Sequence, residues 1–307
     1  WYVFRLMASE VKVGLTGSGG DELFGNYGKF SAYETSPLLR AASRPALASA
    51  ARRAPSWAWS AWRKLTDLAP DSLLGAGRKR RLKELDKLFE APFGHHYYAN
   101  QVYFSDRAKR ETVFNGAAGG LEDTAAFIQR IYDEAAPARA RDGVAHVDFR
   151  TQLPEEFLLM TDRFSMAHSL EARTPLLDHE LVEKVFRIPA HLRTRPGDLK
   201  YLFKRAVSDL LPEEILGARK KGFVIPIERW LRGPLRPLAE RLLAPERLKR
   251  QGLFRPTFYQ TYVAPHVEGR ADHTWQVWSA LMFQLWHVVF VEQKAAGKPS
   301  YSWRDLL

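Results

Sequence analysis

The feature that most constrains this chain is a short β-branched run that ends in a glycine-rich turn and passes directly into a helical pattern. The run covers residues 11–15, the turn covers residues 16–20, and the helical pattern begins at Asp21. A strand, a tight turn and a helix in this order belong to α/β architectures, in which ligands collect at the carboxyl ends of parallel strands. We therefore predict an α/β fold that contains part of a parallel sheet.

The rest of the chain is predicted to be mainly helical, because it is rich in Ala, Leu and Arg and offers no further run that we identify as a strand. Residues 1–7 resemble the inside of a helix, and further helices are predicted over residues 154–166, 178–185, about 200–211 and about 274–293. Asp178 suits an N-cap. In the last helix we expect one core-facing side, made of Trp275, Trp278, Leu281, Leu285, Val288 and Val289.

Composition excludes several classes of protein. The 307 residues are 46% apolar and 26% charged, as in an ordinary globular protein of one large domain or two small ones. No apolar run approaches the roughly 20 residues of a membrane-spanning helix, and the start has no secretory or transit pattern, so we expect a cytoplasmic protein without a membrane partner. The absence of cysteine excludes disulfides, thiolate metal sites and a cysteine nucleophile from this chain.

The excess of Lys and Arg over Asp and Glu has two possible interpretations. The formal charge is +11, and much of the excess lies in residues 40–81, where Trp57, Trp59 and Trp62 are interspersed with Arg and Lys. Basic and aromatic residues together can indicate nucleic-acid binding, but a solvated helical face gives the same pattern. We favour the solvated face and do not expect nucleic acid as a partner.

We treat residues 1–307 as one domain, in which residues 37–85 form a basic, Ala- and Arg-rich variable insertion. The chain begins at Trp1 and not at a methionine. We therefore expect a fragment or a processed piece. An oligomer is compatible with the sequence.

The glycine-rich turn has the parts of a polyphosphate site. Glycines allow close approach of the backbone, and successive N–H groups at the start of a helix attract anions. Asp21 can supply a hard oxygen ligand to Mg²⁺, which bridges phosphate oxygens and keeps several waters. On the pattern alone, an ordinary tight turn followed by favourable first-turn acids at Asp21 and Glu22 is an equally good interpretation.

Longer motifs carry a resemblance to a known family. The string Leu-Thr-Gly-x-Gly-Gly-Asp-Glu-Leu-Phe-Gly-x-Tyr at residues 15–27 closely resembles the second nucleotide-site loop of asparagine synthetases. Residues 153–156, 162–167 and 169–178 form a second match in type, order and spacing. A third match runs from Lys200 through residues 211–215 to residues 219–223 and Pro226. The resemblance is strong over about residues 9–30 and 145–235 and thin elsewhere.

The resemblance implies part of a PP-loop-like nucleotide-binding domain and a two-stage reaction. ATP adenylates the side-chain carboxylate of aspartate, or of a related acid, with release of pyrophosphate, and ammonia from glutamine then displaces AMP. The family's roles, carried over, put Asp21 on Mg²⁺ with pyrophosphate and make Lys220 the cation that stabilises charge in the transition state. The nucleotide-binding positions are then Thr16, Gly17, Gly19, Gly20, Asp21 and Glu22.

Other polar residues in the matched segments have a structural interpretation. Arg163 and Arg173 could orient a carboxylate or phosphate, but a buried pair with Asp162 or Glu171 would serve equally well, and we favour that role. His168 has no partner at metal-ligand spacing, so we expect it to be packed or exposed.

The chain departs from the family in two ways. The glutaminase domain that supplies ammonia and the Ser-Gly-Gly-x-Asp-Ser loop that first grips ATP are both missing from residues 1–307, so we expect this polypeptide to be inactive alone. Ser18 stands where asparagine synthetases usually carry Asp or Glu associated with the adenylated intermediate. We count Ser18 among the catalytic positions and doubt that free aspartate is the acceptor.

Two other functions stay open. The same scaffold serves amidotransferases and cyclases of the surface-polysaccharide, β-lactam and lasso-peptide type, which act on other carboxylates. The second alternative is a degenerate nucleotide-binding scaffold without catalysis.

Overall fold

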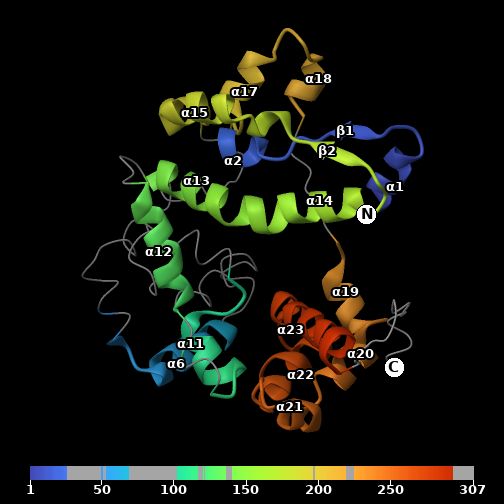
Figure 1. Cartoon of the computed structure of the whole chain (residues 1–307). Coiled ribbons are helices and arrows are strands. Elements are labelled where there is room, and N and C mark those ends of the chain that lie inside the picture. The colour runs from blue at the N-terminus through green and yellow to red at the C-terminus, as the bar shows by residue number, and fades with distance from the viewer. Residues whose placement is uncertain are drawn as a thin grey trace. The chain divides into compact units, whose positions relative to one another are not determined.

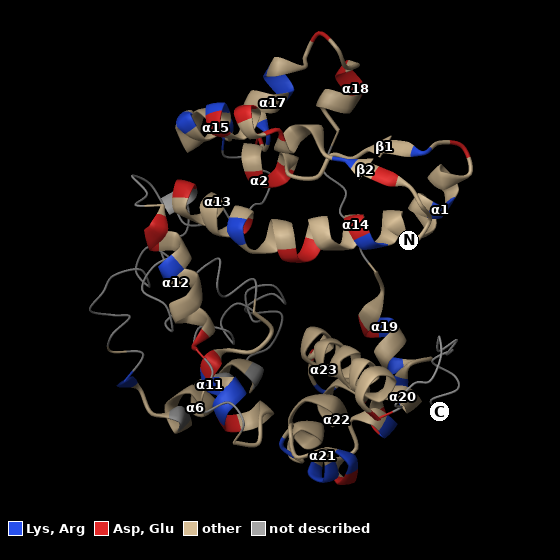
Figure 2. Ribbon diagram, in the orientation of Figure 1, with Lys and Arg blue, Asp and Glu red and all other residues tan. Residues whose placement is uncertain are grey.

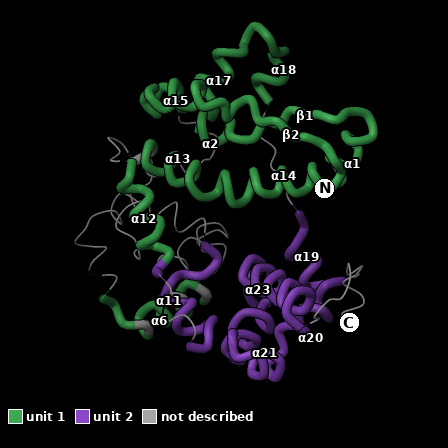
Figure 3. The backbone as a smooth tube through the Cα atoms, in the orientation of Figure 1, with its two compact units in different colours: residues 1–100, 124–219 green, residues 101–123, 220–307 purple. Residues whose placement is uncertain are grey.

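The computed structural model describes residues 1–25, 50, 53–68, 102–116, 120, 122–135, 140–195, 198–218 and 225–292 (Figure 1). Contacts divide the chain into two compact units (Figure 3). Unit 1 combines Trp1–Asn100 with Thr124–Arg219, and unit 2 combines Gln101–Asp123 with Lys220–Leu307. That the units form one functional domain stays a prediction. Of the predicted insertion, only residues 50 and 53–68 are described.

Unit 1 is mainly helical and holds a small sheet. Its elements in chain order are α1 (Tyr2–Ala8), β1 (Val13–Leu15), α2 (Gly20–Phe24), α6 (Ser56–Leu68), α12 (Thr124–Glu134), α13 (Ala140–Arg150), the π-helical turn η3 (Leu153–Leu158), α14 (Leu159–Met166), β2 (Glu171–Arg173), the 3₁₀ turn η4 (Pro175–Leu177), α15 (His179–Arg187), α16 (Ala190–Arg193), α17 (Tyr201–Ala206) and α18 (Glu213–Leu216).

The sheet joins two segments that lie far apart in the sequence. Strand β1 pairs with β2 in parallel, with Val13 opposite Glu171, Gly14 opposite Ala172 and Leu15 opposite Arg173. The predicted strand, turn and helix are therefore present as β1, a turn and α2. The described residues show a mostly helical chain with a two-stranded parallel sheet, and β2 is a strand that the sequence analysis did not identify.

Local signals place several of the helices in unit 1 correctly, whereas α6, α12, α13, α16 and α18 are not among the predicted helices. The side chain of Asp178 accepts hydrogen bonds from the backbone N–H groups of Glu180 and Leu181, which confirms it as the N-cap of α15. Elements η3 and α14 cover the helix predicted at residues 154–166. The helix predicted over residues 200–211 is too long, because α17 ends at Ala206. Just beyond this end, the hydroxyl of Ser208 donates a hydrogen bond to the carbonyl oxygen of Arg205. Side-chain hydrogen bonds of this kind compete with the backbone hydrogen bonds of a helix.

A small apolar core fixes α2 within unit 1. Leu23 is fully buried and Phe24 and Val185 are nearly so. The rings of Phe24 and Phe203 stack with centroids 4.9 Å apart. The partly buried side chains that pack around this group are Leu181, Val182, Phe186, Leu202 and Phe203. Helix α2 is therefore anchored by α15 and α17, both of which follow it in sequence by more than 150 residues.

Unit 2 is built from helices around a larger apolar core. Its described elements are α11 (Asp106–Ala108), η1 (Lys109–Val113), α19 (Ile227–Arg232), α20 (Arg236–Leu242), α21 (Pro245–Gln251), η5 (Tyr259–Val263), α22 (Ala264–Val267), α23 (Thr274–His287) and η6 (Val288–Glu292). Helix α23 contains no Lys, Arg, Asp or Glu, and Figure 2 shows it tan throughout.

The predicted core face of α23 is only partly correct. Leu281 and Val288 are buried, whereas Trp275 is 47% exposed and stacks on Tyr103 with ring centroids 5.5 Å apart. Val277, Ala280 and Gln284 are buried instead. The buried face is therefore shifted by about one residue from the predicted face. The prediction was only partly correct because a helix that is apolar on most sides does not show from its periodicity which side is buried.

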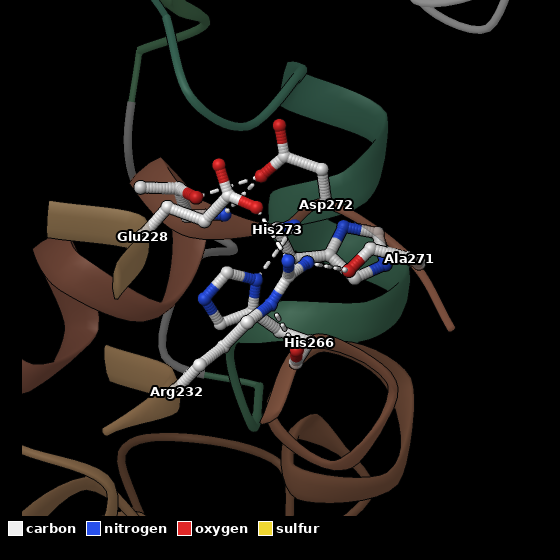
Figure 4. A network of polar contacts seen from close by, with 7 residues as sticks. Glu228, Arg232, His266, Ala271, Asp272 and His273 are labelled. Atoms are coloured by element: carbon white, nitrogen blue, oxygen red, sulfur yellow. Dashed lines mark hydrogen bonds and ion pairs between the residues drawn. The ribbon is translucent and has the colours of Figure 1, made fainter. Parts of the chain in front are cut away.

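A buried histidine lies in a network of polar contacts in unit 2 (Figure 4). His266 is fully buried, and its Nδ1 accepts a hydrogen bond from the backbone N–H of His273 at 3.3 Å. Arg232 donates from Nε to the carbonyl oxygen of His266 at 2.9 Å. Asp272 accepts from both the backbone N–H and the hydroxyl of Thr274, the first residue of α23.

This network sets the charge state of His266. Burial, and next the nearby positive charge of Arg232, lower the pKa of His266, although Asp272 and Glu228 act in the opposite direction. The neutral imidazole is therefore the form that the folded protein favours.

None of the helices in the described parts of the chain combines the length and the apolar character that crossing a membrane requires.

Phe258 provides a test of the unit 2 core. Its side chain is fully buried between Phe104, Phe254 and Tyr262. We expect Phe258→Ala to lower the free energy of unfolding by about 3–5 kcal/mol, measured by urea denaturation, because it leaves a cavity. The matched change Phe290→Ala, at a side chain that is 71% exposed, should stay within about 0.5 kcal/mol of the wild type. Equal effects of the two changes would contradict this packing.

His266 provides a test of pH dependence. Because its pKa is lower in the folded than in the unfolded state, the unfolded chain binds more protons below about pH 6.5, and stability should fall on acidification. We expect the free energy of unfolding to drop by up to about 1.4 kcal/mol per pH unit from this residue. His266→Asn should remove that part of the slope, whereas His179→Asn, at an exposed histidine, should keep it. An unchanged slope in His266→Asn would refute the assignment.

Candidate functional site

The glycine-rich turn directly follows β1 and is tied to β2. The backbone N–H of Thr16 donates to the carbonyl oxygen of Arg173 at 2.8 Å, which continues the pairing of the two strands by one bond. The hydroxyl of Thr16 donates to Oγ of Ser18 at 3.2 Å. Gly17 is exposed, and Thr16 and Ser18 are half-buried. The first predicted site residues therefore lie together at the carboxyl end of a parallel strand, where α/β folds bind ligands.

The last two glycines of the turn pack closely against a neighbouring turn, and at Gly19 the backbone conformation also favours glycine. Gly19 has a φ of 86°, which is left-handed, and a Cβ atom there would lie 2.2 Å from Cδ2 of Leu177. A Cβ atom at Gly20 would lie 2.9 Å from Cδ1 of Leu176. The turn η4 therefore packs directly against the glycine-rich turn, and two of the matched sequence segments meet here.

Asp21 faces a lysine from the third matched segment. Nζ of Lys200 lies 2.6 Å from Oδ1 of Asp21, and both side chains are about one third exposed. Lys200 is the residue before α17 and has a φ of 56°, a left-handed backbone conformation that is unfavourable for a side chain of this kind. The surrounding fold therefore holds Lys200 in place. Lys200 belongs to a matched segment of the sequence, but nothing in its sequence context indicates that it lies beside Asp21.

Glu22, the acid that follows Asp21 in the sequence, lies in a different environment. Glu22 is 2% exposed and belongs to the buried side of α2, although the sequence analysis had counted it with the nucleotide-binding positions. Of the two acids, Asp21 is the one that solvent reaches. The role of Glu22 stays a prediction.

The described residues hold no cluster of three or more His, Cys, Asp or Glu side chains that could enclose a metal ion. A single accessible carboxylate suits Mg²⁺ better than other metals, because Mg²⁺ is usually bound by one or two carboxylates together with phosphate oxygens and waters. Asp21 is therefore the residue that could hold Mg²⁺ next to a phosphate.

Of three further residues for which a structural role is expected, Arg173 and His168 have structural contacts, whereas Arg163 and Asp162 are both exposed and do not form the expected buried pair. Arg173 forms a two-point ion pair with Glu171, with Nε 2.8 Å from Oε1, but both side chains are exposed and not buried as expected. This hydrogen bond lowers the pKa of Glu171. Arg163 is exposed. His168 packs edge-on against Trp1 with ring centroids 4.4 Å apart, as a packed histidine should.

Lys220, the predicted catalytic cation, lies outside the described residues, together with residues 219 and 221–224. Its role stays a prediction from the sequence.

Comparisons with known proteins agree with the motifs. The chain matches the asparagine synthase family over residues 1–288. It is 24% identical over 296 residues to asparagine synthetase [glutamine-hydrolyzing] 1 of Bacillus subtilis (strain 168), covering 96% of this chain and 43% of that protein. It is 30% identical over 305 residues to a putative asparagine synthetase [glutamine-hydrolyzing] of Mycobacterium tuberculosis (strain ATCC 25618 / H37Rv), covering 98% of this chain and 43% of that protein.

A relative with another name is also similar. The amidase chry2 of Gibberella zeae (strain ATCC MYA-4620 / CBS 123657 / FGSC 9075 / NRRL 31084 / PH-1) is 24% identical over 245 residues, covering 74% of this chain and 34% of that protein. The chain thus spans less than half the length of each of these relatives. Because the family match covers nearly the whole chain and the sequence motifs meet at one turn of the structure, the chain belongs to the asparagine synthase family.

Proposed function

We propose that the protein is part of an ATP-dependent synthetase that activates a carboxylate and converts it to an amide. The carboxylate oxygen attacks the α-phosphorus of ATP and pyrophosphate leaves. Ammonia then attacks the acyl carbon of the adenylate and AMP leaves with the bonding electron pair. The observation that carries the proposal is the turn after β1, where Nζ of Lys200 lies 2.6 Å from Oδ1 of Asp21, next to two closely packed glycines.

The residues of the turn have complementary roles in this proposal. Thr16 and Gly17 contact the nucleotide, and Gly19 and Gly20 keep the backbone free of side chains where the phosphates approach. Asp21 holds Mg²⁺, which supplies positive charge to the pyrophosphate oxygens when bound.

Two lysines supply the remaining positive charge in this proposal. Lys200 sits beside Asp21 and offsets the negative charge of its carboxylate, which would otherwise repel the phosphates. Lys220 stabilises the charge that develops as the pyrophosphate leaves, as the resemblance to the family implies. The nitrogen comes from a glutaminase domain that residues 1–307 do not contain.

The acceptor is proposed to be a carboxylate other than that of free aspartate. Ser18 cannot act as the carboxylate that the family usually carries at this position, and its hydroxyl accepts a hydrogen bond from Thr16. The chain is also similar to a protein whose name, amidase, does not refer to asparagine. Aspartate, with asparagine as the product, is the alternative.

Asp21 and Lys220 provide the test of the chemistry. In the full-length protein that contains this chain, Asp21→Asn and Lys220→Ala should each reduce pyrophosphate release from ATP by about 100-fold to 1,000-fold, because each removes charge that stabilises the transition state. Pyrophosphate release is measured with a coupled assay at saturating ATP and Mg²⁺.

Matched controls separate this effect from a general loss of charge. Asp123→Asn and Lys184→Ala change one exposed acid and one exposed lysine that form ion pairs away from the turn. Both should leave the rate of pyrophosphate release within about twofold of the wild type, since exposed ion pairs contribute little. If Asp21→Asn and Lys220→Ala behave like these controls, the proposed roles are wrong.

The acceptor is tested with the full-length protein, ATP, Mg²⁺ and glutamine. With free aspartate we expect little or no asparagine, because the carboxylate that Ser18 replaces is missing. Asparagine formation at a rate typical of enzymes, about 1 s⁻¹ or faster, would show that aspartate is the acceptor after all.

A further inference from the structure

Helix α2 is held at both ends by side chains that follow α15 in the sequence, those of Arg193, Thr194 and Lys200. At its start, Asp21 is paired with Lys200. At its end, the carbonyl oxygens of Leu23 and Gly25 accept hydrogen bonds from the side chains of Arg193 and Thr194. The last carbonyl groups of a helix have no partner within the helix, so such side chains determine where the helix ends.

Arg193 is built into this position. Its side chain is 3% exposed, and one nitrogen donates to the carbonyl oxygen of Leu23 at 3.0 Å. A second nitrogen lies 2.5 Å from Oδ1 of Asp142 on α13. The guanidinium also lies over the ring of Phe186, 5.1 Å from its centroid. The planar guanidinium therefore connects α2 to α13 and α15 at once, which the single ammonium of a lysine could not do in the same way.

Thr194 holds the residue that follows α2. Its hydroxyl donates to the carbonyl oxygen of Gly25 at 3.0 Å, and this oxygen is buried with it. Gly25 has a φ of 72°, and a Cβ atom there would lie 2.9 Å from Cγ2 of Thr194. The contact thus requires a glycine on one side and a short hydroxyl side chain on the other.

We propose that Arg193 and Thr194 are positioning residues that set where α2, and with it Asp21 and the glycine-rich turn, lies relative to the bound nucleotide. The helix has only five residues, so a shift at its end is transmitted to Asp21 through about one turn of rigid backbone. This inference rests on the proposed function for its kinetic consequence. Its structural consequence, the order of residues 16–25, does not depend on that function.

The test uses Thr194→Val and Arg193→Lys in the full-length protein, with Thr194→Ser as the conservative variant that keeps the hydroxyl. We expect Thr194→Val and Arg193→Lys to raise the KM for ATP in pyrophosphate release by roughly threefold to tenfold, as the loss of one hydrogen bond predicts. Hydrogen exchange of the backbone N–H groups in residues 16–25 should accelerate by a similar factor. Thr194→Ser should behave as the wild type in both measurements.

Arg232→Lys is the matched control, because Arg232 also donates to backbone carbonyl groups, those of His266 and Ala271, but in unit 2. It should lower the melting temperature without changing the KM for ATP or the exchange of residues 16–25. The positioning proposal is overturned if Thr194→Val and Arg193→Lys change only the melting temperature, as this control does. If the wild type releases no pyrophosphate, the proposed function fails, and the exchange of residues 16–25 alone decides the positioning proposal.

Discussion

The parallel pairing of β1 with β2 is the constraint on which the rest of the site depends. It joins residues 13–15 to residues 171–173. The hydrogen bond from the backbone N–H of Thr16 to the carbonyl oxygen of Arg173 extends this pairing to the first residue of the turn. Once the strands are in this register, η4 must follow β2 alongside the turn that follows β1. Leu176 and Leu177 then pack closely against Gly20 and Gly19, and Arg193 and Lys200 hold the two ends of α2.

Much of the fold was predictable because its signals are local. A β-branched run before a glycine-rich turn specified β1 and α2, and the carboxylate of Asp178 specified the start of α15, since an N-cap needs only the two or three residues that follow it. The glycine-rich turn was identified as the candidate site for the same reason. Its glycines and its acid are contiguous in sequence, and Asp21 is accessible in the structure as the prediction requires.

The parts that were not predictable depend on contacts between distant residues. Strand β2 reads Glu-Ala-Arg, which has no β-branched residue, and it is extended because β1 pairs with it. Lys200 lies beside Asp21 only after α2 and α17 have packed together through Phe24 and Phe203. The same holds for Arg193, whose burial and partners could not be inferred from its neighbours in the sequence.

We propose above that the turn after β1 holds the pyrophosphate part of ATP while a carboxylate is adenylated. Exchange of radiolabelled pyrophosphate into ATP tests it most directly, using the full-length protein with Mg²⁺ and a series of carboxylic acids but no ammonia or glutamine. We expect label to enter ATP only when an accepted carboxylate is present, because adenylation is then reversible and amide formation is blocked. Exchange that does not depend on any carboxylate, or release of ADP and phosphate in place of AMP and pyrophosphate, would contradict it.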